Sequence, residues 1–269
     1  MKSYANEKPK HVRRLISEEK FTGPTSGMCN GFAQANLVIL PQKYSEEFKH
    51  FANLNNKACP VLEILENGNQ YTKKLADHAN IASELPKYWI YMNGKFQKET
   101  TNIEAYWQED FVSFLIGCSF TFEAALMAAG IEVRHITTNS NVPMYKTGIM
   151  TIPFGKFSGP VVVSMRPIRK DQIDQTILIT SEYPEVHGAP IHIGNPEQIG
   201  IMDLNSPDYG DAVNINDDEI PVFWACGVTP QAAASQAKPD LMITHAPGHM
   251  FIADIKNEAL KSIRSEEKR

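Results

Sequence analysis

The sequence contains few cysteines, and they lie far apart. Its 269 residues include only four, Cys29, Cys59, Cys118 and Cys226, and no two of them form a Cys-x-x-Cys pair. The first twenty residues are polar and carry no secretory signal. Widely spaced thiols without such a signal favour reduced cysteines, so we expect a cytoplasmic protein.

Several common motifs and one kind of charge pattern are also missing. The sequence has no G-x-x-x-x-G-K-[ST], no G-x-G-x-x-G and no G-x-S-x-G, which gives no support to nucleotide-binding or hydrolase templates. With 26 Lys and Arg against 31 Asp and Glu, the formal net charge is -5, and the basic residues form no long stripe. This balance argues against nucleic acid as the main partner and favours a small molecule or a protein, including another copy of the chain.

The chain has no uninterrupted hydrophobic run long enough to cross a membrane. The longest apolar stretch, residues 111–131, is broken by Ser113, Gly117, Ser119, Thr121 and Glu123, and its flanks are not basic. We interpret this stretch as protein core. A composition of 42% hydrophobic and 21% charged residues is typical of globular proteins, and the length suffices for one large or two ordinary domains.

The same apolar stretch is the first candidate for chemistry. Its spacing predicts one helix over residues 102–116, which Gly117 ends, and a second helix that starts at Ser119 or Thr121 and runs to Gly130. Cys118 and Ser119 would then lie at a helix start, where unpaired backbone N–H groups attract a carboxylate and lower the pKa of a thiol. The alternative for Cys118 is a buried, inert thiol.

Glu123 is unusual because it is a carboxylate on a mostly apolar helix. Such a group must be paired, shifted in pKa or exposed on the outer face of the helix. The sequence leaves these alternatives open.

The rest of the chain predicts an α/β fold. We expect helices within residues 2–20, from Ser45 and from Thr229, and strands at 32–40, 60–65, 88–92, 131–136, 159–167, 175–180, 191–193, 220–225 and 241–244. An Asn93-Gly94 pair after residues 88–92 is typical of a hairpin turn. Since residues 131–225 are richer in short β runs, we expect them to form an inserted β-rich subdomain, and residues 1–130 and 226–269 to form the other domain.

Two loops and one amide pair suggest places where an anion or ligand could bind. The loop Thr22–Gly27, with Thr25 and Ser26, is rich in glycine and hydroxyl groups and could hold an anion, although most such loops are only turns. Gln34 and Asn36 enter an apolar strand and need hydrogen-bond partners. The segment Cys226-Gly227-Val228-Thr229 again places small residues between a strand and a helix, as in an anion pocket.

Histidines and one arginine supply the acid, base and carboxylate-binding groups. Four of the eight histidines lie in two short segments, as His187, His192, His245 and His249. Their pKa range suits general acid/base catalysis, whereas the alternatives are backbone hydrogen bonding and a divalent metal held by the loops. Arg166 ends an apolar strand and could clamp a carboxylate or form a structural ion pair.

Eight collinear segments resemble one family. The segments GPTSG, QANLVILP, GCSFTFEAAL, NVPMYKT, VVSMRP, HGAPIHIG, PVFWACGVTPQ and ITHAPGH, spanning about Arg13 to Asp254, are similar to the YcsI-like hydro-lyases and to part of D-glutamate cyclase. This resemblance implies a three-layer α/β/α part joined to a smaller two-layer α/β part. It also implies carbon–oxygen lyase chemistry and, for the cyclase relatives, dehydration of D-glutamate to 5-oxoproline. Lys146, Asn195 and Ala253 depart from the residues expected at those places.

Two functional hypotheses follow. The first is a hydro-lyase of the EC 4.2.1 type acting on a small carboxylic or amino acid, with no cofactor predicted and a divalent metal as the alternative. Its catalytic candidates are Cys118, Glu123, His187, His192 and His245, and its substrate-binding candidates are Thr25, Ser26, Asn36, Ser119, Arg166, Cys226, Gly227, Thr229 and His249. The second hypothesis is a protein that binds a small carboxylate without turning it over.

Overall fold

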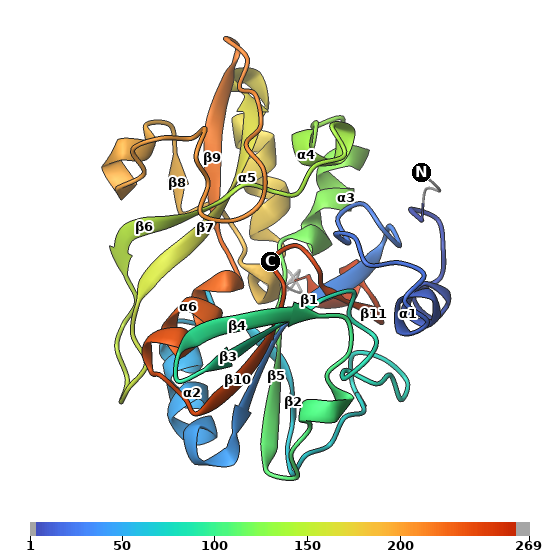
Figure 1. Cartoon of the computed structure of the whole chain (residues 1–269). Coiled ribbons are helices and arrows are strands. Elements are labelled where there is room, and N and C mark those ends of the chain that lie inside the picture. Colours follow the sequence, from blue (N-terminus) through green and yellow to red (C-terminus); the bar gives the residue numbers. More distant parts are fainter. Residues whose placement is uncertain (1–3, 262–269) are drawn as a thin grey trace, which may run out of the picture.

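The chain folds into a mixed α/β structure with two antiparallel sheets, which confirms the predicted α/β class (Figure 1). The computed structural model describes residues 4–261. Within them, no helix combines the length and the apolar character needed to cross a bilayer.

The first sheet is built around a buried central strand, β1, Phe32–Pro41. The strand order is β2-β5-β1-β10-β3-β4, and β11 also pairs with β1. The bounds are β2 Val61–Leu65, β3 Tyr88–Met92, β4 Lys95–Thr100, β5 Phe111–Gly117, β10 Leu241–His245 and β11 Phe251–Lys256. The predicted hairpin between β3 and β4 is confirmed, since Asn93 and Gly94 both have positive φ angles, 51° and 75°.

The second sheet lies above the first in Figure 1 and has the order β6-β7-β9-β8. Its strands are β6 Met144–Met150, β7 Pro160–Arg169, β8 His192–Ile193 and β9 Glu219–Ala225. The strands predicted near 159–167, 191–193 and 220–225 are therefore confirmed.

The helices frame these sheets. They are α1 Pro9–Ser17, α2 Gln42–Leu54, α3 Phe120–Ala128, α4 Arg134–Thr137, α5 Ile173–Ser181 and α6 Val228–Gln236, with 3-10 turns at Glu104–Tyr106, Lys170–Gln172, Pro184–Val186, Pro196–Ile199 and Asn257–Leu260. Helices α2 and α6 pack on the face of the first sheet that carries Val38 and Leu40, whereas Leu37 and Ile39 face a second cluster that includes Phe122 of α3.

The helix predicted over residues 102–116 is wrong. Residues 111–117 instead form β5, which pairs with β1 on one side and β2 on the other. Phe114 packs into the cluster around α2, and Leu115 packs into the opposite cluster. A strand buried on both faces is apolar at nearly every position, so a helical spacing can be found in it by chance.

Two predicted strands are also helices. Residues 173–181 form α5, in which the Thr176 hydroxyl donates to the Gln172 carbonyl at 2.8 Å and the Thr180 hydroxyl to the Thr176 carbonyl at 2.9 Å. Threonine satisfies its hydroxyl within the helix in this way, and packing outweighs its β preference. Residues 131–136 alternate in polarity but contain the start of α4, and Arg134 in its first turn forms ion pairs with Glu132 and Glu219.

Strand β10 pairs with β1 and with β3, so the chain returns to the first sheet after building the second. This is the pairing expected if residues 226–269 rejoin residues 1–130. The division into two domains at these boundaries, and the layering implied by the family resemblance, stay predictions.

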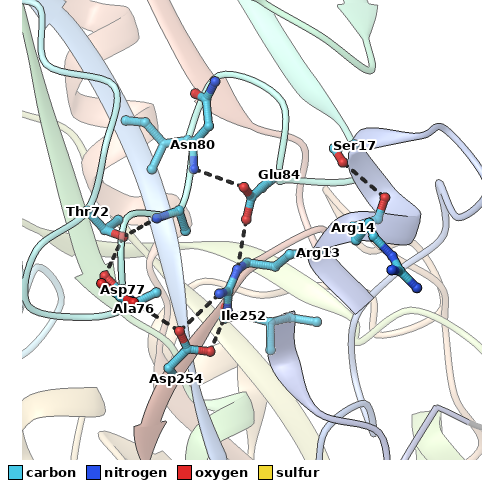
Figure 2. A network of polar contacts seen from close by, with 12 residues as sticks. Arg13, Arg14, Ser17, Thr72, Ala76, Asp77, Asn80, Glu84, Ile252 and Asp254 are labelled. Atoms are coloured by element: carbon cyan, nitrogen blue, oxygen red, sulfur yellow. Dashed lines mark hydrogen bonds and ion pairs between the residues drawn. The ribbon is translucent and has the colours of Figure 1, made fainter. Parts of the chain in front are cut away.

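A buried arginine fixes helix α1 to the rest of the molecule (Figure 2). Arg13 is 2% exposed. Its Nε donates to Glu84 at 2.8 Å, and its two Nη groups donate to both carboxylate oxygens of Asp254 at 2.9 and 3.0 Å and to the Ile252 carbonyl at 2.8 Å. A bidentate guanidinium–carboxylate pair holds both position and orientation.

Replacing Arg13 should therefore destabilise the fold. We expect Arg13→Met to lower the free energy of unfolding by about 2–3 kcal/mol, because Glu84 and Asp254 keep their charge without a partner. The expected loss lies below that of a fully buried pair since the Glu84 and Asp254 side chains are 21% and 35% exposed. Urea unfolding measures it. The neighbouring, exposed Arg14 gives the matched control: Arg14→Met should change the same quantity by less than about 0.5 kcal/mol, and equal losses would contradict the role of Arg13.

Candidate functional site

A cavity of about 540 Å³ lies beside the loop Thr22–Gly27. Its walls come from this loop, from helix α4, from residues 139–141 and from the segments before and after helix α1. The lining residues are Tyr4, Phe21, Gly23, Pro24, Ser26, Gly27, Met28, His135, Ile136, Asn139, Ser140, Asn141 and Asp211. This volume suits a small-molecule ligand.

Behind Ser26 and His135 lies a buried carboxylate, Glu123, on the first turn of α3. Glu123 is 1% exposed, and its carboxylate accepts hydrogen bonds from Ser26 Oγ at 3.1 Å and from Arg166 Nε and Nη2 at 3.0 and 2.5 Å. His135 Nε2 lies 3.0 Å from Glu123 Oε1 and 3.0 Å from Ser26 Oγ. The carboxylate that sequence reasoning left as paired or exposed is therefore paired, and it joins three elements distant in the sequence.

Arg166 uses its guanidinium within the protein. Besides Glu123, it donates from Nη1 to Ser164 Oγ and from Nη2 to Ser119 Oγ, each at 3.0 Å, and it is 0% exposed. Its charge also lies over the rings of Phe122 and Trp224, at 5.4 and 5.3 Å from their centres. The carboxylate that Arg166 grips in this structure is that of Glu123, which matches the structural ion pair that the sequence left open.

The electrostatics keep Glu123 ionised. Burial alone would raise the pKa of its carboxyl group, but the nearby His135 and Arg166 outweigh burial and lower the pKa to about 2. An ionised Glu123 cannot serve as a proton donor near neutral pH. It can orient His135 and Ser26 and stabilise positive charge on the imidazole.

The arrangement of Ser26, His135 and Glu123 differs from a serine-hydrolase triad. In that triad the carboxylate and the serine contact opposite nitrogens of the imidazole. Here both contacts meet at Nε2, and the Ser26 hydroxyl donates directly to Glu123. The geometry therefore supports proton transfer between the cavity and the Ser26–His135 pair better than an activated serine nucleophile.

The structure does not support a thiolate at Cys118. The predicted junction exists, since Cys118 lies between β5 and α3, and the Phe120 N–H approaches its sulfur at 3.5 Å. However, burial raises the pKa of this thiol well above its usual range, so the expected lowering is wrong. Burial likewise raises the pKa of Cys226 to about 11, against the opposing effect of the N–H groups of Val228 and Gly227.

Several predicted binding residues instead hold the backbone. Asn36 Nδ2 donates to the Gly117 carbonyl at 2.7 Å, and a Cβ added to Gly227 would lie 2.0 Å from that nitrogen. The Thr229 hydroxyl accepts from the Val162 N–H at 2.9 Å. Thr25 Oγ1 accepts from the Met250 N–H at 3.0 Å and joins the Thr22–Gly27 loop to residues 245–250. Only Ser26 of these candidates both lines the cavity and contacts Glu123.

His187 and His245 are buried and hydrogen-bonded to backbone. His187 Nδ1 lies 2.9 Å from the Lys57 carbonyl oxygen, and His245 Nδ1 lies 3.1 Å from the Leu37 nitrogen and 3.2 Å from its oxygen. Burial lowers the pKa of each imidazole to about 4. Both rings are therefore neutral at physiological pH.

His192 and His249 lie away from Glu123. His192 pairs with Phe223, which pairs with Met165, whereas Arg166 pairs with Val222. Because directly paired residues point to the same face of a sheet, His192 and Arg166 lie on opposite faces. His249 Nδ1 lies 3.0 Å from the Pro247 oxygen, and burial lowers its pKa. The catalytic roles predicted for His187, His192 and His245 and the binding role predicted for His249 stay predictions, but none of these four residues lines the Ser26–His135 cavity.

His135 is the candidate that sequence reasoning missed. It occurs as a single histidine in a segment interpreted as a strand, and nothing in its neighbours marks it. The available signal was Glu123, since a buried carboxylate requires partners from elsewhere in the chain. Among residues 4–261, no three His, Cys, Asp or Glu side chains are placed to hold a metal ion.

Removing the negative charge of Glu123 should destabilise the folded protein at pH values above the pKa of this residue. We expect Glu123→Gln to lower the free energy of unfolding by about 3–5 kcal/mol at pH 7, because Arg166 is left buried without its counter-ion. Since the folded-state pKa is lowered from 4.5 to about 2, the stabilisation is fully present above about pH 4.5 and is lost as the pH falls toward 2. Urea unfolding at several pH values should thus show the difference between wild type and variant narrowing over this range. Exposed Glu46→Gln is the control, and a pH-independent difference would contradict the assignment.

The buried histidines predict a separate pH effect. The pKa of His245 is lowered from 6.5 to about 4, so the unfolded chain takes up a proton that the folded protein resists. Its contribution to stability is present above pH 6.5 and is lost as the pH falls through 4, by up to about 1.4 kcal/mol per pH unit. We expect His245→Gln to reduce the slope of unfolding free energy against pH in this window, whereas exposed His50→Gln should not. Parallel slopes for His245→Gln and wild type would refute the neutral, buried imidazole.

Comparison with known proteins places this site in a family. The family model described as D-glutamate cyclase matches residues 112–254, which include Glu123, His135 and Arg166. A protein from Clostridium beijerinckii named "Putative hydro-lyase" is 54% identical over 258 residues, which is 96% of this chain and 98% of the relative. The Bacillus subtilis protein named "Putative hydro-lyase YcsI" is 54% identical over 252 residues, 94% of this chain and 98% of the relative.

A solved nitrogen repressor-like protein from Methanococcus jannaschii aligns with 87% of this chain and 91% of its own, at 10% identity and a TM-score of 0.39. That likeness is too low to support any statement on fold or function. The relatives found by sequence are much more similar, because each is 54% identical to this chain over nearly the whole length of both sequences. The chain therefore belongs to the D-glutamate cyclase family, together with relatives that are named hydro-lyases.

Proposed function

We propose that this protein is a hydro-lyase that removes water from a small carboxylic or amino acid bound in the Ser26–His135 cavity. Cyclisation of D-glutamate to 5-oxoproline is the variant that the family description suggests. One observation carries the proposal: Ser26 and His135 line the cavity, and each also contacts the ionised, buried Glu123.

The cyclisation needs balanced proton transfers. The substrate nitrogen attacks the carbon of the side-chain carboxyl, a C–N bond forms and a C–O bond breaks. The two protons released by the ammonium group leave with the departing oxygen as water. A group that accepts a proton from nitrogen and returns it to oxygen serves both halves of this exchange, and such groups typically contribute ~10²–10⁴-fold in rate.

His135 with Ser26 can perform that exchange. His135 Nε2 and Ser26 Oγ lie 3.0 Å apart, so a proton can pass between them along one hydrogen bond. The negative charge of Glu123, 3.0 Å from Nε2, stabilises the imidazole while it carries the proton. Arg166 in turn prevents Glu123 from taking that proton, because it favours the ionised carboxylate.

The charges lining the cavity suit an amino acid. Asp211 lies in the wall and accepts from the Asn141 N–H through one oxygen at 2.8 Å. An ammonium group beside Asp211 and a carboxylate beside Ser26 and His135 would each meet a group of complementary character.

Turnover of D-glutamate and of a panel of small hydroxy and amino acids, followed by mass spectrometry, tests the proposal. We expect His135→Gln to lower turnover by about 10²-fold or more and Ser26→Ala by at least about tenfold, measured below the melting temperature of each variant. Exposed His50→Asn is the matched control and should retain full turnover. His192→Asn and His245→Asn in the same series decide whether the roles predicted from sequence belong to those residues.

Two outcomes would overturn the proposal. Full activity of a folded His135→Gln variant would remove this residue from the reaction. Binding of carboxylates without turnover of any panel member would favour the alternative, a non-catalytic carboxylate-binding protein.

A further inference from the structure

We infer that the Ser26–His135 cavity has a second, apolar half, built by Tyr4 and Phe21, that takes the hydrocarbon part of an acid larger than glutamate. This inference rests on the proposed function only for the statement that the bound molecule is a substrate. The binding preference itself follows from the shape and chemistry of the cavity.

Tyr4 precedes helix α1 in the sequence and Phe21 follows it, and their rings are in contact at the cavity. Their ring centres lie 5.4 Å apart at an interplanar angle of 70°, which is the favourable edge-to-face geometry. Both rings line the cavity and also pack on the buried cluster that contains Val12, Ile16 and Met28. An aromatic wall held from behind in this way is preorganised, so a ligand that contacts it loses little free energy in ordering it.

The cavity therefore divides by chemistry. Ser26, His135, Asn141 and Asp211 give its lining hydrogen-bonding and charged groups. Tyr4, Phe21, Met28 and Ile136 give the same lining its apolar surface, in which the Tyr4 and Phe21 rings lie side by side. A ligand with a carboxylate at one end and a hydrocarbon body at the other matches this division.

The volume supports the same reading. About 540 Å³ lies within the range of roughly 300–1,000 Å³ that encloses drug-sized ligands. Glutamate, with ten non-hydrogen atoms, would leave much of this space and most of the aromatic wall in contact with water.

Calorimetric titration with unbranched and aromatic carboxylates tests the inference directly. The probes are acetate, butyrate, hexanoate and 3-phenylpropanoate. Each CH₂ buried against the aromatic wall should raise affinity by about fourfold. We expect at least a tenfold gain from acetate to hexanoate and a comparable gain for 3-phenylpropanoate.

The Phe21→Ala variant should remove most of this gain and leave the affinity for acetate within about twofold of the wild type. Phe96→Ala, which removes a 51% exposed ring on β4, is the control and should leave the whole series unchanged. Phe21→Leu guards against loss of folding, since it keeps an apolar contact with the cluster behind it and should retain part of the gain.

The outcomes separate this inference from the proposed function. An affinity that stays flat from acetate to hexanoate in the folded wild type, or a gain that persists in folded Phe21→Ala, overturns the apolar half even if D-glutamate is turned over. An affinity that rises along the series and falls in Phe21→Ala supports the apolar half even if no acid in the turnover panel reacts.

Discussion

The ion pair between Glu123 and Arg166 is the interaction on which the rest of the site depends. It connects helix α3, which packs on the first sheet, with strand β7 of the second sheet. Two charges without water are costly unless their remaining hydrogen-bonding groups are satisfied. Ser119, Ser164, Ser26 and His135 supply those partners, so their positions are set by the same requirement.

In the proposed reaction, this one buried pair serves both the fold and the chemistry. The pair holds the two sheets in one relative arrangement, and it keeps a negative charge directly behind the cavity. If Glu123 were protonated, Ser26 and His135 would lose the charged acceptor that orients them. In that proposal Arg166 is a positioning residue that acts through Glu123, since it is not among the described residues that line the cavity.

Local signals allowed much of the fold to be predicted, but not the partners in the site. The Asn93-Gly94 hairpin and helix α6 were predictable, because turn residues and helix starts act within a few positions. The strand at residues 111–117 was not predictable, because a strand buried on both faces lacks the alternation of apolar and polar residues that distinguishes a strand from a helix. Glu123 and Arg166 could be singled out as unusual residues. Their pairing could not, because the contact spans 43 positions and depends on how two sheets pack.

The connections of strand β1 also constrain the order in which the molecule can be assembled. Along one edge β1 pairs with β5, whereas the other edge pairs with β10 and β11, which come late in the chain. Arg13 of α1 likewise has its partner, Asp254, late in the chain. During synthesis from the N-terminus, the backbone groups on that second edge of β1 remain without strand partners until nearly 250 residues have left the ribosome. An unpaired, apolar strand edge is prone to pair with other chains. A nascent chain that stops before β10 therefore exposes the centre of its largest sheet, and shielding of β1 during synthesis becomes a requirement for efficient folding.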